Sequence, residues 1–335
     1  MRYTGNTRYI IVRKSKDCLK KKMKYGLFSG FLWALDTVLL GLALTIGPFS
    51  KNQELIILAP IISTFLHDSF CALWMLLLVG VRKRLKDVGF ACLTPNGRVV
   101  MLGALLGGPL GMTGYVLAIK YIGPGYTAAI SAFYPAFGAL LAHFILKEHL
   151  SLIQTISLFL AVLGIVGIGY LSSESTIVSN PILGISAALL CVIGWGSEAV
   201  LGAWGMRHAL IDNNVALTIR ESVSAIFYGI FILPTFGCWN GVVEVFPTTA
   251  GMGIAACALV GTASYLFYYL AIRTIGAARG MALNISYSAW AFIVSIFVFG
   301  TIPTATEWLL CILIMIGTIF AACKPQELFH IYRRL

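Results

Sequence analysis

Two pairs of residues combine an indole ring with a carboxylate three positions further along the chain: Trp33 with Asp36, and Trp195 with Glu198. On a helix, side chains three positions apart share a face, so each pair would present its ring and its charge together. An aromatic face attracts a quaternary ammonium ion by roughly 2 kcal/mol or more when water is excluded, and a carboxylate supplies the countercharge. Both pairs therefore favour a cation that cannot donate hydrogen bonds. The alternative for the two tryptophans is packing, or an aromatic belt at a membrane surface.

Further aromatic residues recur at helical spacing in two later segments. Tyr268 and Tyr269 follow Tyr265 by three and four positions, and Trp290 follows Tyr287 by three. Residues at these spacings lie on one helix face. They would either pack the helices together or close an aromatic cage around the cation proposed above, and the acid at position 198 favours the cage.

Ionisable residues also lie inside apolar runs: Asp36, His67, Asp68, Arg220 and Glu221. A charge in the middle of a bilayer costs at least about 2.5–3.5 kcal/mol, so each is expected to face a cavity or a charged partner. Two interpretations remain open for them. They form a mutually paired scaffold, or they are coupling or gating groups of a transport site.

The eight cysteines are scattered, without a C-x-x-C spacing or a neighbouring histidine cluster. Structural zinc sites need such spacings. We therefore predict no metal site and no cofactor, and interpret the cysteines as small apolar residues.

The composition shows which elements must position these residues. Of 335 residues, 59% are apolar and 11% are charged, against about 45–50% and 25% in soluble domains. The mean hydropathy is +0.89. These values exclude an ordinary cytosolic enzyme, a disordered scaffold and a secreted disulfide-bonded domain.

A helix needs about 20 apolar residues to cross the hydrocarbon. The sequence contains ten runs of about that length, which predicts an all-α integral membrane protein with ten transmembrane helices. The runs are 25–47, 54–80, 97–119, 124–146, 151–171, 181–205, 215–237, 249–272, 279–300 and 305–323.

The distribution of Lys and Arg predicts the orientation. The net charge is +11, and cytoplasmic loops carry the excess of basic residues. With a cytoplasmic N-terminus, 21 of the 24 Lys and Arg fall on the cytoplasmic side and two outside, while Arg220 lies within a span. Both termini are therefore expected in the cytoplasm, and nucleic acid is not needed to explain the charge.

An internal repeat relates the two halves of the chain. An offset of 153 matches Leu117–Lys120 with Leu270–Arg273, and it places Tyr134 on Tyr287. The same offset places His67-Asp68 on Arg220-Glu221, and an offset of 162 places the Trp33 pair on the Trp195 pair. Five crossings per copy invert the second copy, as in alternating-access carriers. We expect a basic tail at 1–24, five-helix repeats at 25–171 and 181–323, and a C-terminal tail at 324–335.

Several short motifs in this order give the chain a family resemblance. It resembles the drug/metabolite transporter superfamily with EamA-type inverted repeats, and within it the LicB-type choline permeases of bacteria. The motifs are Gly103–Met112, Ala118–Gly123, Ser131–Ala136, Trp195–Glu198, Ile219-Arg220, Ser264–Tyr269 and Asn284–Tyr287 with Trp290.

The resemblance implies a secondary transporter that imports choline or a related quaternary ammonium compound through the bacterial cytoplasmic membrane. It implies Trp33 and Trp195 as cage walls, closed by Tyr268 or Tyr269, Tyr287 and Trp290. Glu198 would be the countercharge, and His67 or Asp68 a proton-responsive group. Both proton-coupled symport and uniport remain open, as does the oligomeric state.

Two other functions are alternatives to choline import. An exporter or importer of another small metabolite, such as an amino acid, would need a cation for the substrate's carboxylate, and Arg220 is the basic residue well inside a span. A membrane enzyme is disfavoured because no Asp-rich metal motif and no phosphate-binding Gly loop followed by Lys and Ser or Thr is present. We therefore predict a transporter and not an enzyme.

Overall fold

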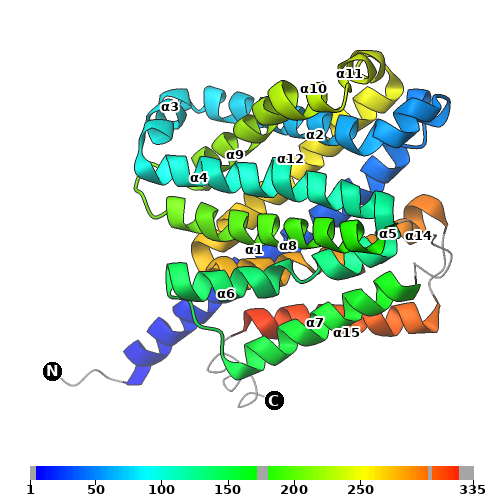
Figure 1. Ribbon diagram of the computed structural model, residues 1–335. Helices are drawn as coiled ribbons and strands as arrows, with labels where there is room; N and C mark the ends of the chain where they lie inside the picture. The colour runs from blue at the N-terminus through cyan, green and yellow to red at the C-terminus, as the bar shows by residue number, and fades with distance from the viewer. Residues whose placement is uncertain (1–4, 172–179, 301–303, 324–335) are drawn as a thin grey trace.

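The computed structural model describes residues 5–171, 180–300 and 304–323, and within them every regular element is a helix (Figure 1). Ten segments are long and apolar enough to cross a membrane, which confirms the predicted all-α fold with ten spans. They are Met23–Ala43, Gln53–Val81, Pro95–Ile122, Tyr126–Leu146, Leu152–Leu171, Pro181–Gly205, Asn213–Thr235, Thr249–Ile275, Ala277–Val298 and Ala305–Ala322. The predicted C-terminal tail at 324–335 lies outside the described residues.

The helices of the first half are α1 (Gly5–Ala43), η1 (Gly47–Ser50), α2 (Gln53–Val81), α3 (Leu85–Leu93), α4 (Pro95–Leu105), η2 (Leu106–Met112), α5 (Thr113–Ser131), α6 (Tyr134–Leu146) and α7 (Leu152–Leu171). Those of the second half are α8 (Pro181–Gly205), α9 (Asn213–Phe227), η3 (Tyr228–Ile232), α10 (Leu233–Thr235), α11 (Trp239–Val245), α12 (Thr249–Ile275), α13 (Ala277–Asn284), α14 (Tyr287–Phe299) and α15 (Ala305–Ala322).

Helix α1 is longer than the predicted first span. It begins at Gly5 and runs without interruption to Ala43, so most of the basic tail is helical. Figure 1 shows its N-terminal part projecting beyond the bundle. No helix was predicted there, because an apolar pattern is the signal for a span and this stretch has none.

Polar side chains fix where several spans begin. Such caps satisfy backbone N–H groups that have no partner in the first turn of a helix. Asp212 Oδ1 accepts hydrogen bonds from the amides of Asn214 and Val215 at 3.1 and 3.0 Å. Asn52, Thr94, Asn180, Thr248 and Thr304 cap α2, α4, α8, α12 and α15 in the same way.

Two spans are interrupted at equivalent positions. Helix α5 ends at Ser131 and α6 begins at Tyr134, and 153 residues later α13 ends at Asn284 and α14 begins at Tyr287. The same offset relates Lys147 (φ 57°) and Gly300 (φ 67°), the left-handed residues that end α6 and α14. The structure therefore repeats its local breaks at the offset found in the sequence. Broken helices near the middle of a membrane protein commonly mark a binding site.

The third span contains a π-helical segment, η2, in the Gly-Gly-Pro stretch of the sequence. Pro109 cannot donate a backbone hydrogen bond, and π segments accompany such interruptions, often at functional sites. A Cβ atom at Gly107 would collide with the Glu198 carboxylate, and one at Gly108 with Ser224. The two glycines therefore allow this span to pass directly beside α8 and α9.

Candidate functional site

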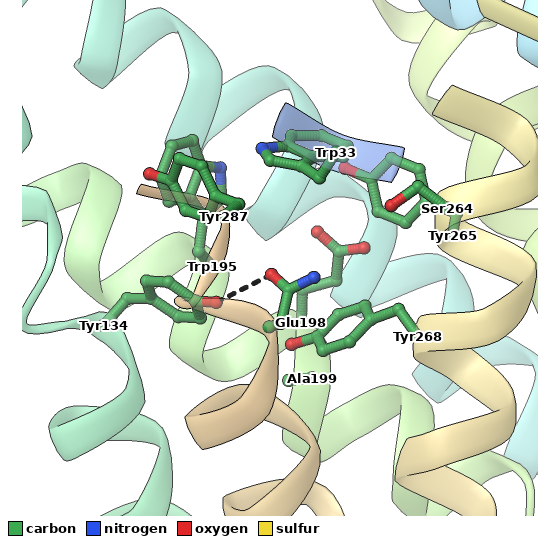
Figure 2. Close-up of a pocket in the computed structure, with 10 residues that line it drawn as sticks. Trp33, Tyr134, Trp195, Glu198, Ala199, Ser264, Tyr265, Tyr268 and Tyr287 are labelled. Atoms are coloured by element: carbon green, nitrogen blue, oxygen red, sulfur yellow. Dashed lines mark hydrogen bonds between the residues drawn. The ribbon is translucent and has the colours of Figure 1, made fainter. Parts of the chain in front are cut away.

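An open cavity of about 500 Å³, including the solvent at its mouth, lies among the spans (Figure 2). Its walls come from both halves of the chain, through α1, α6, α8, α12, α13 and α14. The lining residues are Trp33, Tyr134, Trp195, Glu198, Ala199, Ser264, Tyr265, Tyr268, Asn284 and Tyr287. One acid and six aromatic side chains thus surround this space.

Glu198 is the acid of this cavity. It lies on α8 and is 6% exposed. Its Oε1 accepts hydrogen bonds from Arg220 Nε and from the Tyr269 hydroxyl, both at 3.0 Å. The absence of a side chain at Gly107 leaves room for Oε2. Glu198 is therefore held by polar partners on one side while it contributes to the cavity wall on the other.

Arg220, on α9, is 1% exposed and holds several acids at once. Its Nη1 donates to Glu221 Oε2 at 2.7 Å and lies 3.5 Å from Asp68 Oδ2. Its guanidinium carbon lies 4.7 Å from the centre of the Tyr265 ring, and Nη2 donates to the Tyr265 hydroxyl at 3.1 Å. Arg220 thus joins the cavity acid to two acids behind it.

The chain of contacts continues from Asp68 to the first span. Asp68 Oδ2 accepts from the Ser224 hydroxyl at 2.6 Å, and its Oδ1 lies 3.7 Å from His67 Nδ1. His67 Nε2 lies 3.1 Å from Asp36 Oδ1. The structure therefore brings all five predicted coupling or gating residues, together with Glu198, into one set of contacts, called the charge cluster below.

The charge cluster has more acids than bases. Its members are Asp36, His67, Asp68, Glu198, Arg220 and Glu221, so four carboxyl groups face one guanidinium and one imidazole. All six side chains are buried. In addition, Glu221 Oε1 has no hydrogen-bond partner among the described residues. A buried excess of negative charge is unfavourable unless protons or a bound cation neutralise it.

The aromatic walls hold one another by ring contacts, edge to face for Trp33 with Tyr265 and for Trp195 with Tyr134, and tilted for Trp195 with Tyr115. Trp33 meets Tyr265 edge to face with ring centres 4.9 Å apart, and Trp195 lies between Tyr115 and Tyr134 at 5.3 and 5.8 Å. Edge-to-face pairs are worth about 0.5–1.5 kcal/mol each. These contacts fix the orientation of both indole rings, which come from repeat-related helices α1 and α8.

An uncharged polar group also contributes to the cavity wall. Tyr134 donates its hydroxyl hydrogen to Asn284 Oδ1 at 3.1 Å, as the dashed line in Figure 2 marks. Asn284 Nδ2 donates to Ser29 Oγ at 2.8 Å, and Ser264 Oγ donates to the Ser29 carbonyl at 2.8 Å. The cavity therefore combines an acidic group with a neutral hydrogen-bonding group.

The start of α13 is fixed by a carboxylate from the first half of the chain. Glu148 accepts from the amides of Ala277 and Ala278 at 3.0 and 3.1 Å. Every residue of α13 is buried. This half of the ninth span, with its single arginine Arg279, is therefore covered completely by neighbouring helices.

Outside the spans, Arg84 forms ion pairs with Asp87 and Asp212, and the second of these joins two loops. Arg84 Nη1 donates to Asp212 Oδ2 at 2.6 Å, which links the segment before α3 to the start of α9. Partial burial acts to raise the pKa of Asp212, but hydrogen bonds from the Val215 amide and from Arg84 outweigh it and lower this pKa below its ordinary value.

The sequence-predicted residues are placed as follows. Trp33, Trp195, Glu198, Tyr268 and Tyr287 line the cavity. Tyr269 is 1% exposed and contacts Glu198 from outside the lining. Trp290 does not line the cavity; it packs on Phe31 with ring centres 5.5 Å apart, and its buried Nε1 has no partner among the described residues.

Five lining residues were not among the predicted site residues: Tyr134, Ala199, Ser264, Tyr265 and Asn284. Four of them carried a usable signal. Tyr134 is the repeat counterpart of Tyr287, and Tyr265 precedes Tyr268 by three positions. Ser264 and Asn284 each begin one of the motifs behind the family resemblance. Ala199 carried none, because small residues are common throughout membrane spans.

Comparison with known proteins gives three findings. The model of the EamA-like transporter family matches residues 20–170 and 182–323. Protein LicB of Haemophilus influenzae is 31% identical over 269 residues, which is 80% of this chain and 85% of that protein. A solved structure described only as a crystal structure of a protein aligns with a TM-score of 0.68 at 17% identity, covering 90% of this chain and 97% of the other. The last likeness concerns the fold alone.

Proposed function

Because the chain belongs to the EamA-like transporter family, we propose that it imports choline or a related quaternary ammonium compound by alternating access. The observation that carries the proposal is the cavity itself, where Glu198 is surrounded by Trp33, Trp195 and tyrosine rings. A quaternary ammonium ion cannot donate hydrogen bonds, so aromatic faces and a countercharge are what bind it. The resemblance to the LicB-type choline permeases points to the same substrate.

The charge cluster supports a cation over an anion. Its acids outnumber its bases, so the region around Glu198 attracts positive charge. A substrate cation beside Glu198 also repels Arg220, whose guanidinium can then be held by Asp68 and Glu221, since both already lie within 3.5 Å of it. The cluster therefore contains partners that can take over Arg220 when substrate arrives.

An amino acid fits the cavity less well. Its carboxylate would need a cationic partner, and no Lys or Arg is among the ten residues that line the described cavity. Arg220 is the nearest candidate, and three carboxylates already hold it. An amino-acid carrier remains the alternative to test.

Both termini are placed in the cytoplasm in this proposal, and the membrane is the bacterial cytoplasmic membrane. The orientation rests on the 21 basic residues that fall on one side. It puts α13 and its cap Glu148 toward the cytoplasm. The complete burial of α13 supports an outward-facing state, in which the cytoplasmic end is closed.

We further propose that import of the substrate is coupled to the movement of protons. Uniport is the alternative. His67 lies between Asp36 and Asp68, and the contacts lead from there through Arg220 to Glu198. A proton bound by His67, or at the unpartnered Oε1 of Glu221, changes the attraction that Arg220 feels. The position of Arg220 in turn changes the charge that Glu198 presents to the substrate.

A ligand screen on the purified full-length protein tests the function directly. Choline, glycine betaine, carnitine, amino acids and polyamines are added in turn, and thermal unfolding in detergent is followed. We expect choline to raise the melting temperature, since a ligand that binds the native state stabilises it. A response to amino acids without a response to choline would overturn the assignment.

A further inference from the structure

The break in the ninth span brings a primary amide to the cavity. Asn284 is the last residue of α13, and α14 begins three residues later at Tyr287. Its repeat counterpart, Ser131, ends α5 in the same way but does not line the cavity. The backbone breaks at equivalent positions in the two halves, but the side chains at the breaks differ. The amide of Asn284 lines the cavity, whereas the hydroxyl of Ser131 does not.

The amide is held in a fixed orientation by two hydrogen bonds. Its oxygen accepts from Tyr134 at 3.1 Å and its nitrogen donates to Ser29 Oγ at 2.8 Å. A primary amide has two N–H donors and two acceptor positions. One donor and one acceptor position are left after these bonds, on a side chain that is 8% exposed and lines the cavity.

A hydroxyl group matches this wall and a carboxylate does not. A hydroxyl both donates and accepts, so it can use either remaining position of the amide. A carboxylate is charged and only accepts, and the described lining contains no Lys or Arg to neutralise it. Glu198 in the same cavity would repel it further.

From this arrangement we infer that Asn284 forms a hydrogen bond with a hydroxyl group of the substrate. The substrates are then quaternary amino alcohols and not zwitterionic betaines. This inference rests on the proposed function, because it places the ammonium group at Glu198 and the aromatic walls. It adds a second recognition point, which determines specificity through a neutral hydrogen bond. The bond is oriented by Tyr134 and Ser29.

The experiment compares choline with ethyltrimethylammonium, in which hydrogen replaces the hydroxyl group, and with glycine betaine. Binding to the purified full-length protein is measured by calorimetry. We expect the wild type to bind choline about tenfold more tightly than ethyltrimethylammonium, and betaine more weakly than either, since one net hydrogen bond gives discrimination of that order. Asn284→Ala is expected to bind choline and ethyltrimethylammonium equally, with the affinity for the second unchanged.

Two further variants keep the test decisive. Tyr134→Phe removes the hydroxyl that orients the amide and preserves the ring, so discrimination should fall even if Asn284→Ala does not fold. Ser131→Ala, at the repeat counterpart, should keep the tenfold preference. Its hydroxyl donates to the carbonyl of Ala128 within its own helix.

The outcomes separate this inference from the proposed function. Equal binding of choline and ethyltrimethylammonium by the wild type overturns the role of Asn284 and leaves quaternary ammonium transport standing. Retention of the preference in both Asn284→Ala and Tyr134→Phe also overturns it. Binding of neither ammonium compound by the wild type refutes the proposed function itself.

Discussion

Arg220 donates from Nε to Glu198 Oε1 across 3.0 Å, so the acid of the cavity already has a cationic partner within the protein. The same guanidinium lies 4.7 Å from the centre of the Tyr265 ring. An internal cation thus sits beside a carboxylate and an aromatic ring, the surroundings proposed for the substrate. Substrate and Arg220 are therefore expected to share Glu198 during transport.

Glu198→Gln should reduce choline affinity at least thirtyfold, because loss of one partner of a buried charge pair costs about 2–5 kcal/mol. Arg220 keeps Asp68 and Glu221 as partners, so the variant should still fold. Binding to purified protein and uptake into proteoliposomes measure the effect. Unchanged affinity would remove Glu198 from the site.

Trp195→Ala should weaken choline binding by about thirtyfold, the equivalent of roughly 2 kcal/mol for a desolvated cation over an indole ring. Trp195→Phe retains an aromatic face and should lose much less. Trp308→Phe is the matched control, since Trp308 is 41% exposed and does not line the cavity. Equal effects of the two Trp195 variants would contradict an aromatic cage.

Gly107→Ala should impair transport by displacing Glu198, because the added Cβ would occupy the place of its carboxylate oxygen. Gly41→Ala is the control, as a Cβ there meets no atom within 4 Å. Expression level, melting temperature and choline uptake are compared for the two variants. Normal choline affinity in Gly107→Ala would mean that Glu198 can rearrange without consequence.

An inward proton gradient should accelerate choline uptake into proteoliposomes at constant membrane potential. His67→Gln and Glu221→Gln should each reduce this acceleration while choline counterflow continues, since counterflow needs no net proton movement. The side chains stay polar and similar in size, so packing should be preserved. If the gradient has no effect on the wild type, uniport is the better account.

Asp212→Ala should lower the melting temperature more than Asp212→Asn does. Asn preserves the cap of α9 and loses the ion pair with Arg84, whereas Ala loses both, and a lost cap costs about 1 kcal/mol.

The effect of the Asp212 charge should also depend on pH, because the native pKa of Asp212 is lowered. The charge contributes stability above the ordinary carboxyl pKa, and that contribution disappears as the pH falls through the native pKa. The difference between wild type and Asp212→Asn should therefore vanish in acid. A difference independent of pH would exclude the charge as its cause.

The fold could be predicted from the sequence because apolar runs of about 20 residues are a direct consequence of crossing a bilayer. The 153-residue offset separately indicated the repeat. The site was predicted less completely. Tyr268 and Tyr269 are adjacent, and only the rotation of α12 against α8 decides that the first lines the cavity while the second binds Glu198 from behind. Trp290 has the spacing of a cage residue, yet its ring packs on Phe31.

The breaks after Ser131 and Asn284, and the left-handed residues Lys147 and Gly300, bear on how such a molecule could open. Because the two halves are inverted copies with matching joints, the parts that close one mouth of the cavity have equivalents at the opposite mouth. In an alternating-access carrier built this way, opening and closing would need no dedicated lid, because equivalent joints would exchange roles. The carrier would then interconvert between two conformations, and a bound cation would shift the balance toward the one that binds it better.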